Sequence, residues 1–428
     1  MKTLYDTVAE FISGDWGAEA KCADSPQSAY CIRAADVVPI ETHDYSAIPE
    51  RFVSQNSFTQ RQLRKGDIVI EKSGGSPTQS TGRVVYISQS LLSAKRNIIC
   101  SNFCTAIRIK PQWDPYFVYQ YWRQVYNTGV FFNYEGKTSG LKNLQLEVAL
   151  KSIPVPEIDL PTQLRIAGVL GSIDEKIELN RKKIAELEAL AKTIYDYWFV
   201  QFDFPDANGK PYKSSGGKMV WNEQLKREVP DGWEVGKFND MLSNLKDGTH
   251  NPPQRVSKGI PLLTGTMFGD IFLTYGDATY ISLEDYATIH SSYKPEIWDL
   301  VMTKIGTLGK INYLTESDLP LAIHCNSALL KFAPHYKGPF SFLMCKDQIF
   351  QTRLQQKKGQ SVQEFVSLDR IASIDVELPA MHIVEQFNSC TAPIFDYLVV
   401  LREELLELLK IRGDVLPLLM NGQVEVAG

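Results

Sequence analysis

One long heptad repeat constrains this chain of 428 residues more than any other feature. Between residues 161 and 199, apolar residues alternate at spacings of four and three, the pattern of a helix lying along another helix. Asp159 is placed to cap this helix, and Pro161 suits its first turn. The one polar position of the seam is Asn180, and a buried Asn there fixes register and partner. The seam consists of Ile166, Leu170, Ile173, Ile177, Asn180, Ile184, Leu187, Ala191, Ile194 and Trp198.

A second seam near the C-terminus has the same rhythm. A shift of 224 residues superimposes the two seams and places Asn180 on Glu404, the only charged residue of the second one. The helices therefore look like copies, although two unrelated amphipathic helices would be the simpler alternative. In an antiparallel pair of copies, equivalent positions meet only at the crossing point, so we expect Asn180 and Glu404 to approach each other there. The second seam consists of Ile383, Phe387, Cys390, Ile394, Tyr397, Leu401, Glu404, Leu408, Ile411, Val415 and Leu418.

The segments before the two helices also repeat. DIVIEKSG, which begins at Asp67, matches DLVMTKIG, which begins at Asp299, and Pro115-Tyr116 matches Pro339-Phe340. These patterns predict an α+β fold: two similar globular α/β domains separated by two long antiparallel coiled-coil helices, with pseudo-two-fold symmetry. The expected divisions are a first domain at 1–155, a long helix with an aromatic connector at 156–233, a second domain at 234–378 and a distal helix at 379–428.

The composition favours a cytoplasmic location. No apolar run reaches the roughly 18 residues that a membrane span needs, and Asp6 and Glu10 interrupt the N-terminal stretch where a signal peptide would be apolar. The seven cysteines lack metal-ligand spacing, so we expect reduced thiols. No catalytic residue, metal site or cofactor site is predicted.

The charge distribution points to DNA. The whole chain has a formal net charge of −5, yet residues 61–110 contain nine basic and only two acidic residues. A basic patch inside an acidic chain fits a DNA reader, although a solvated charged face is the plainer interpretation. The residues that we expect to contact DNA are cations in or near the repeated loops: Lys72, Arg83, Lys95 and Arg96 in the first domain, with Lys304 and Lys310 in the second.

Aromatic residues are concentrated directly after the first long helix. They either cap the helix bundle or anchor a partner protein, since Trp and aromatic side chains are common at interface centres. The residues expected to dock a partner are Trp198, Phe199, Phe202 and Phe204.

The central block resembles a known family. PTQLRIAGVLGSIDEKIELNRKKIAELEALAKTIYDYWF, followed by FDFP, GKPY, SGG and PDGW, is similar to the conserved region of type I restriction-modification specificity (S) subunits. The resemblance implies that each domain is a target-recognition domain that reads one half of a split site in double-stranded DNA. It also implies that the helices act as a spacer, that two methyltransferase (M) subunits dock on the conserved regions, and that restriction (R) subunits join them. A helix of 39 residues reaches about 58 Å, more than one turn of DNA at roughly 34 Å.

Two other functions compete with this one. The sequence Asn251-Pro252-Pro253-Gln254 resembles the Asn-Pro-Pro-Tyr motif of adenine methyltransferases, but Gln254 replaces the aromatic residue that stacks on a flipped base. No glycine-rich loop for S-adenosylmethionine precedes it. The other alternative is a coiled-coil adaptor without DNA contact, against which the basic stretch counts.

Overall fold

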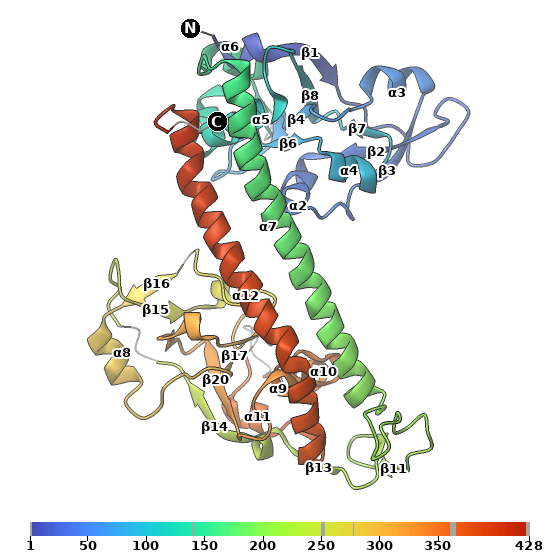
Figure 1. Cartoon of the computed structure of the whole chain (residues 1–428), viewed down its shortest axis with the longest axis vertical. Helices are drawn as coiled ribbons and strands as arrows, with labels where there is room; N and C mark the ends of the chain where they lie inside the picture. The colour runs from blue at the N-terminus through green and yellow to red at the C-terminus, as the bar shows by residue number, and fades with distance from the viewer. Residues whose placement is uncertain (1, 139–140, 250–252, 277, 360–364, 425–428) are drawn as a thin grey trace. The chain divides into compact units, whose positions relative to one another are not determined.

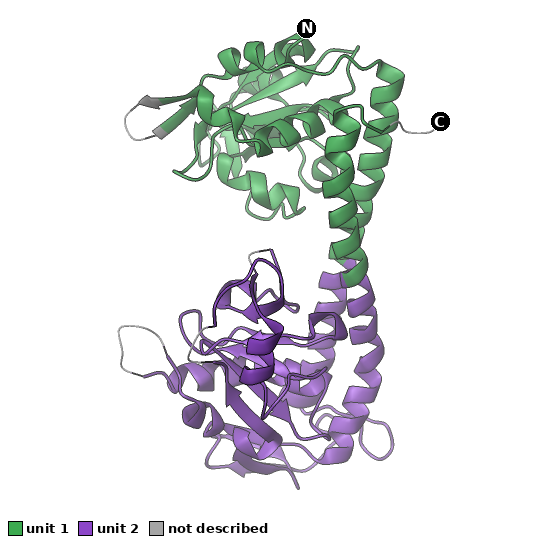
Figure 2. Cartoon of the chain, turned by 90° about the vertical axis from the view of Figure 1, so that its left-hand side faces the viewer, with its two compact units in different colours: residues 1–182, 403–428 green, residues 183–402 purple. Residues whose placement is uncertain are grey.

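The chain divides into two compact units, shown in Figure 2. Unit 1 comprises residues 1–182 and 403–428, and unit 2 comprises residues 183–402. Each unit holds one globular α/β domain and parts of two long helices, α7 (Leu160–Tyr195) and α12 (Met381–Met420), labelled in Figure 1. The computed structural model describes residues 2–138, 141–249, 253–276, 278–359 and 365–424.

The domain of unit 1 is built on an antiparallel sheet with strand order β1-β8-β4-β6. A second sheet, β3-β2-β7, pairs β2 with β7 in parallel, and a small third sheet has the order β5-β10-β9. The strands are β1 (Val8–Ser13), β2 (Gln27–Ile32), β3 (Glu50–Val53), β4 (Ile68–Glu71), β5 (Ser73–Gly74), β6 (Val84–Tyr86), β7 (Ile98–Cys100), β8 (Cys104–Ile109), β9 (Glu135–Thr138) and β10 (Leu141–Leu144). The helices are α1 (Leu4–Thr7), α2 (Val37–Glu41), α3 (Gln55–Arg61), α4 (Gln89–Ala94), α5 (Pro115–Asn127) and α6 (Leu146–Ser152).

The domain of unit 2 repeats this topology. Its main sheet has the order β14-β20-β17-β18, and its second sheet, β16-β15-β19, again contains one parallel pair. The strands are β11 (Met219–Asn222), β12 (Arg227–Pro230), β13 (Glu234–Lys237), β14 (Leu242–Asp247), β15 (Ile260–Leu263), β16 (Thr279–Ile281), β17 (Leu300–Thr303), β18 (Ile311–Tyr313), β19 (Ala322–Ile323), β20 (Ser327–Phe332) and β21 (Asp375–Leu378). The helices are α8 (Leu283–Ile289), α9 (Pro339–Lys346), α10 (Gln348–Gln356) and α11 (Leu368–Ala372).

The repeated sequence motifs explain the repeated elements. β4 and β17 are buried along their whole length because each lies between two neighbours in its main sheet, so an unbroken apolar run suits both. α5 and α9 each begin at a proline, whose missing N–H costs nothing in a first helical turn. Asp114 caps α5 by accepting a hydrogen bond from the backbone N–H of Phe117. The predicted duplication of an α/β domain is confirmed by the matching strand orders.

The two long helices are antiparallel, as predicted. In unit 1, Ile166 near the start of α7 packs in one cluster with Leu419 near the end of α12. In unit 2, Tyr195 at the end of α7 lies edge-on to Phe387 near the start of α12, with ring centroids 6.1 Å apart. Among the described residues, no helix is long and apolar enough to cross a membrane.

The predicted seam of the second helix is only partly correct. Cys390 and Tyr397 are exposed, the latter by 43%, and Ile411 and Leu418 also reach the surface. The buried side of α12 in unit 2 includes Phe395, whose ring lies 5.7 Å from that of Tyr313 in β18. α12 must cover a globular domain as well as α7, so its buried face is displaced from a simple two-helix seam.

Candidate nucleic-acid interface

Matching loops follow the central strands β4 and β17. Gly74 and Gly306 have φ angles of +147° and +79°, and Gly82 and Gly309 have φ angles of +98° and +86°. Glycine adopts such left-handed conformations without the steric cost that a Cβ atom imposes. The motif glycines thus permit left-handed backbone in the loop of each unit, although the loop of unit 1 is longer and contains β5. Most of the predicted DNA-contacting cations belong to these loops.

Arg83 is held inside its loop by Glu71. The Glu71 carboxylate is 99% buried, and it receives Arg83 Nε at 2.7 Å and a second guanidinium nitrogen at 2.8 Å. The same guanidinium donates to the backbone oxygen of Ala34 at 3.0 Å. Hydrogen bonding to Glu71 raises the pKa of Arg83. This bidentate ion pair ties β4 to β6, so Arg83 supports the loop from within.

Lys72, Lys95 and Arg96 lie in more open positions of the same domain. Lys72 is half-buried, and within the described residues it forms no ion pair. Lys95 Nζ lies 4.4 Å from the centroid of the Tyr30 ring, and Arg96 is exposed. Unlike Arg83, these three cations form no ion pair with a carboxylate of the described residues.

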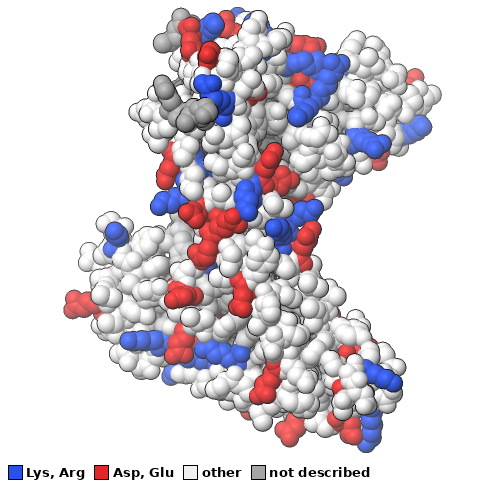
Figure 3. All heavy atoms as spheres, in the orientation of Figure 1, with Lys and Arg blue, Asp and Glu red and all other residues white. Residues whose placement is uncertain are grey.

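The basic stretch of unit 1 is less basic than its composition indicates. Besides Arg83, Arg108 is neutralised: it pairs with buried Asp67 at 2.9 Å and with Glu10. Both acidic residues of the stretch are therefore paired inside the domain. Figure 3 shows a group of Lys and Arg atoms over β1 and β8, with Asp and Glu atoms among them.

The two predicted cations of unit 2 differ in exposure. Lys304 is only 3% exposed, and its ammonium group forms an ion pair with Asp247 at 2.6 Å. Lys310 is exposed, and its Nζ lies 3.4 Å from the backbone oxygen of Phe268. Lys304 thus joins β17 to the end of β14, whereas Lys310 presents a cation at the surface.

The aromatic connector does not form the expected exposed docking surface. These side chains belong to the core of unit 2, where Phe199 packs on Phe340 with centroids 4.7 Å apart. They therefore cap the bundle, which was the alternative that the sequence left open. Instead, Trp221 on β11 is 54% exposed, with Val220 beside it. The four buried residues are Trp198, Phe199, Phe202 and Phe204.

The polar positions of the two helices meet as the repeat predicts. Asn180 is fully buried, and its Nδ2 donates to Glu404 Oε2 at 2.8 Å. Lys176, one turn earlier on α7, forms an ion pair with Glu404 at 3.0 Å.

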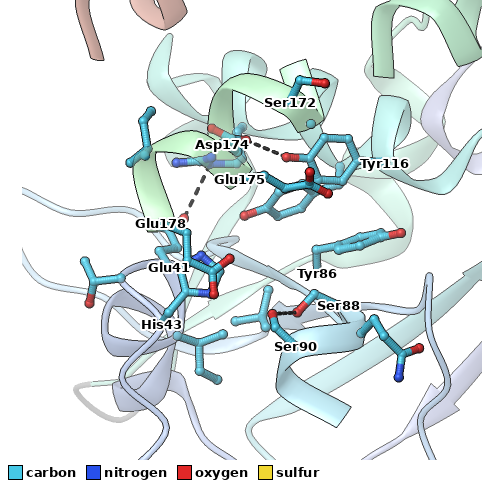
Figure 4. Close-up of a pocket in the computed structure, with 18 of the residues that line it drawn as sticks. Glu41, His43, Tyr86, Ser88, Ser90, Tyr116, Ser172, Asp174, Glu175 and Glu178 are labelled. Atoms are coloured by element: carbon cyan, nitrogen blue, oxygen red, sulfur yellow. Dashed lines mark hydrogen bonds and ion pairs between the residues drawn. The ribbon is translucent and has the colours of Figure 1, made fainter. Parts of the chain in front are cut away.

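A cavity of about 680 Å³ lies in unit 1 between the domain and α7. Figure 4 shows Tyr116 pointing toward Asp174 of α7 and joined to it by a hydrogen bond, with Tyr86 below. On another wall, His43 Nδ1 lies 3.1 Å from Glu178 Oε1. Burial lowers the pKa of His43 despite the opposing effect of Glu178, and burial raises the pKa of Tyr86 to about 12. Sequence reasoning missed this site, because its members are far apart in the chain and carry no motif.

The methyltransferase-like motif has no structural support. Asn251 and Pro252 lie outside the described residues, and Gln254 is exposed. Within the described part of the chain, no group of His, Cys, Asp and Glu has an arrangement that would hold a metal ion.

Comparisons with known proteins agree on one family. A family model described as the type I restriction modification DNA specificity domain matches residues 51–189. The type I restriction enzyme MjaIX specificity subunit of Methanocaldococcus jannaschii is 23% identical over 299 residues, which cover 65% of this chain and 62% of that relative. The MjaVIII specificity subunit of the same organism is 21% identical over 303 residues, covering 69% of this chain and 68% of the relative. The chain thus spans less than two thirds of the first relative's length.

A solved structure is similar in fold. The crystal structure of a type I restriction-modification S subunit from M. genitalium matches with a TM-score of 0.58 and 16% identity, over 98% of this chain and 95% of that one.

Proposed function

Because this chain belongs to the family of type I restriction-modification specificity subunits, we propose that it is the DNA-reading subunit of such a system. Each α/β domain reads one half of a bipartite target in double-stranded DNA, and the helix pair sets the distance between the halves. The chain carries out no chemistry itself and holds no cofactor, since the methyl donor and the catalytic residues belong to its partners. It works in the cytoplasm, where its target DNA lies.

The duplicated topology is the observation that carries this proposal. The main sheets β1-β8-β4-β6 and β14-β20-β17-β18 have the same order, and each domain is attached to the same two helices. Two heads of one fold on a helical spacer suit a site whose halves are separated along DNA. Half-site spacing then follows from protein geometry, as it does in dimeric DNA-binding proteins.

The proposed DNA contacts are those predicted cations that form no ion pair within the described residues. In unit 1 these are Lys72, Lys95 and Arg96, and in unit 2 Lys310. Contacts to phosphates would supply affinity, while contacts to base edges would supply sequence preference. Arg83 and Lys304 are engaged with Glu71 and Asp247, so we assign them an indirect role in shaping the reading loops.

The proposed partners are two methyltransferase subunits and the restriction subunits. We favour exposed apolar side chains as the places where the partner subunits dock. Without a partner, these side chains remain in contact with water, which is unfavourable. In unit 2 they include Trp221 and Tyr397, and in unit 1 they include Leu406 and Ile411. This surface takes the place of the buried aromatic residues that the sequence indicated.

A salt-dependent DNA-binding assay separates a reader from a structural adaptor. The chain assembled with methyltransferase subunits should shift a target duplex, and Lys72→Ala should reduce the slope of log affinity against log salt by about one. Lys151→Ala is the matched control, since Lys151 is an exposed lysine of α6 in the same domain that pairs with Glu147. If the chain is an adaptor without DNA contact, the wild type, Lys72→Ala and Lys151→Ala should show the same affinity for DNA and the same salt slope.

A further inference from the structure

Asp174 of α7 joins three elements of unit 1. It accepts hydrogen bonds from Tyr116 Oη at 2.5 Å and from Gln120 Nε2 at 2.8 Å, both on α5 of the domain. Its other oxygen receives Nε of Arg412 on α12, and Arg412 also donates to Gln120 Oε1 at 3.1 Å. One carboxylate therefore holds the domain to both long helices at once.

The three equivalent positions in unit 2 are apolar. The repeat offset of 224 residues places Tyr116 on Phe340, Gln120 on Met344 and Asp174 on Leu398. All three counterparts are buried in the hydrophobic core of unit 2. At these three positions unit 2 has hydrocarbon packing, and its polar link between α12 and the domain is the separate Arg402–Asp318 pair. In unit 1 the corresponding positions carry the partly buried Asp174 carboxylate and its two hydrogen-bond donors.

The cavity beside Asp174 also reflects a difference between equivalent residues of the two units. Gly171 lines it, and the residue equivalent to Gly171 in unit 2 is Phe395, which is buried against Tyr313. Tyr313 corresponds to Tyr86 by strand register, since Tyr86 of β6 pairs with Ile68 of β4 and Tyr313 of β18 pairs with Leu300 of β17. Tyr86 lines the cavity in unit 1. Where unit 2 places a phenyl ring between domain and helix, unit 1 therefore leaves open space.

The first domain consequently contacts α7 in two different ways. Ile166 and Leu170 pack in the hydrophobic core, at the N-terminal end of the contact. Beyond them, Asp174 and the pair formed by Glu178 and His43 are polar contacts at the walls of the cavity. A domain held by packing at one end and by polar groups beside a void can rock about the packed end once the polar groups are removed.

We propose that Asp174 is a positioning residue, which fixes the angle of the first recognition domain on the helix pair and thereby the spacer length that the protein accepts. The proposal rests on the proposed function, because it needs a bipartite target. A displacement of about 3.4 Å along the DNA corresponds to one base pair, so a modest rocking motion is enough to admit a neighbouring spacer.

The test measures methylation of DNA by the full chain assembled with methyltransferase subunits. The substrates carry the same two half-sites separated by the native spacer, or by one base pair more or fewer. Asp174→Asn keeps the size of the side chain and removes its charge, and Tyr116→Phe keeps the ring and removes one hydrogen bond. Ser172→Ala is the matched control, since Ser172 lines the same cavity but donates only to Gly168 O of its own helix.

We expect Asp174→Asn to raise methylation of the altered spacers, relative to the native spacer, by roughly tenfold, and Tyr116→Phe to raise it by a smaller factor. Ser172→Ala should keep the wild-type profile. A residue with only a structural role would lower methylation of all three substrates together and leave their ratio unchanged, which would overturn the proposal. If Asp174→Asn fails to fold, the ratio measured with Tyr116→Phe decides.

A failure of the proposed function would give a different result from a failure of the role assigned to Asp174. If the wild-type assembly methylates no bipartite substrate at any spacer, the proposed function is wrong. If the wild-type assembly methylates only the substrate with the native spacer, and the Tyr116→Phe and Asp174→Asn assemblies do the same, only the role of Asp174 is wrong.

Discussion

Asn180 Nδ2 donates a 2.8 Å hydrogen bond to Glu404 Oε2, and the two residues occupy equivalent positions in the two copies of the long helix. Equivalent residues of an antiparallel pair meet only where the helices cross, so this bond marks the centre of the repeat. A buried Asn in an otherwise apolar seam costs stability relative to leucine, and in return it selects one register.

Lengthening both helices at this point should lengthen the DNA spacer. Four residues inserted after Asn180, and four after Glu404, add about 6 Å to each helix, which corresponds to roughly two base pairs. Methylation mapping should then report unchanged half-sites with a longer spacer. A four-residue insertion in the turn at Asp206–Gly209 of the connector is the control, and it should leave the spacer as it is. An unchanged spacer after the helix insertions would mean that the helices are not the ruler.

Two lysines of unit 2 should respond in opposite ways to substitution. Lys304→Ala removes the ion pair with Asp247 from a lysine that is almost fully buried, so we expect the melting temperature to fall by an amount equivalent to about 1–3 kcal/mol. Lys310→Ala removes an exposed cation, so the melting temperature should stay the same while the salt slope of DNA binding drops by about one. Thermal melting and a salt series of binding measurements check both. The reverse pattern would contradict the assignment of Lys304 as a loop support.

The sequence predicted those features that depend on local spacing or on the internal repeat. The heptad spacing gave the long helices, and the offset between copies gave the pairing of Asn180 with Glu404. Ion pairs across the fold were not accessible in this way: Glu71 reaches Arg83 only because β4 and β6 are neighbours in a sheet, and Tyr116 reaches Asp174 across 58 positions. The aromatic connector was ambiguous because cores and interfaces favour the same side chains.

The pair formed by Arg402 and Asp318 should make the stability of unit 2 dependent on pH. Both side chains are buried, and they lie 2.7 Å apart. Burial alone would raise the pKa of Asp318, but hydrogen bonds and charge from Arg402, with help from Thr315, lower it below the ordinary value. The stabilisation is therefore present above the ordinary carboxyl pKa near 4 and is lost as the pH falls through the lower, folded-state pKa.

Arg402→Met removes one partner and leaves Asp318 buried as an unpaired charge. At pH 7 the variant should lose about 3–5 kcal/mol of stability in unit 2, and the gap to wild type should narrow in acid, where Asp318 gains a proton. Thermal melting of the wild type and the variant at pH 7 and at an acid pH measures this gap. Lys226→Met is the control, since Lys226 forms an exposed pair with Glu223 at 2.8 Å, and it should melt like wild type at both. A gap that is constant with pH would contradict the assignment.

The central claim is that each domain reads its own half of the target. The most direct measurement replaces residues 1–150 by the corresponding domain of another specificity subunit and maps methylated sites across the genome of the host. Strains with the original chain and without it provide the reference. We predict that one half of the methylated motif changes, while the other half and the length of the spacer stay the same, because the domain of unit 2 and its core are untouched. A motif in which both halves change together, or neither does, would contradict the claim.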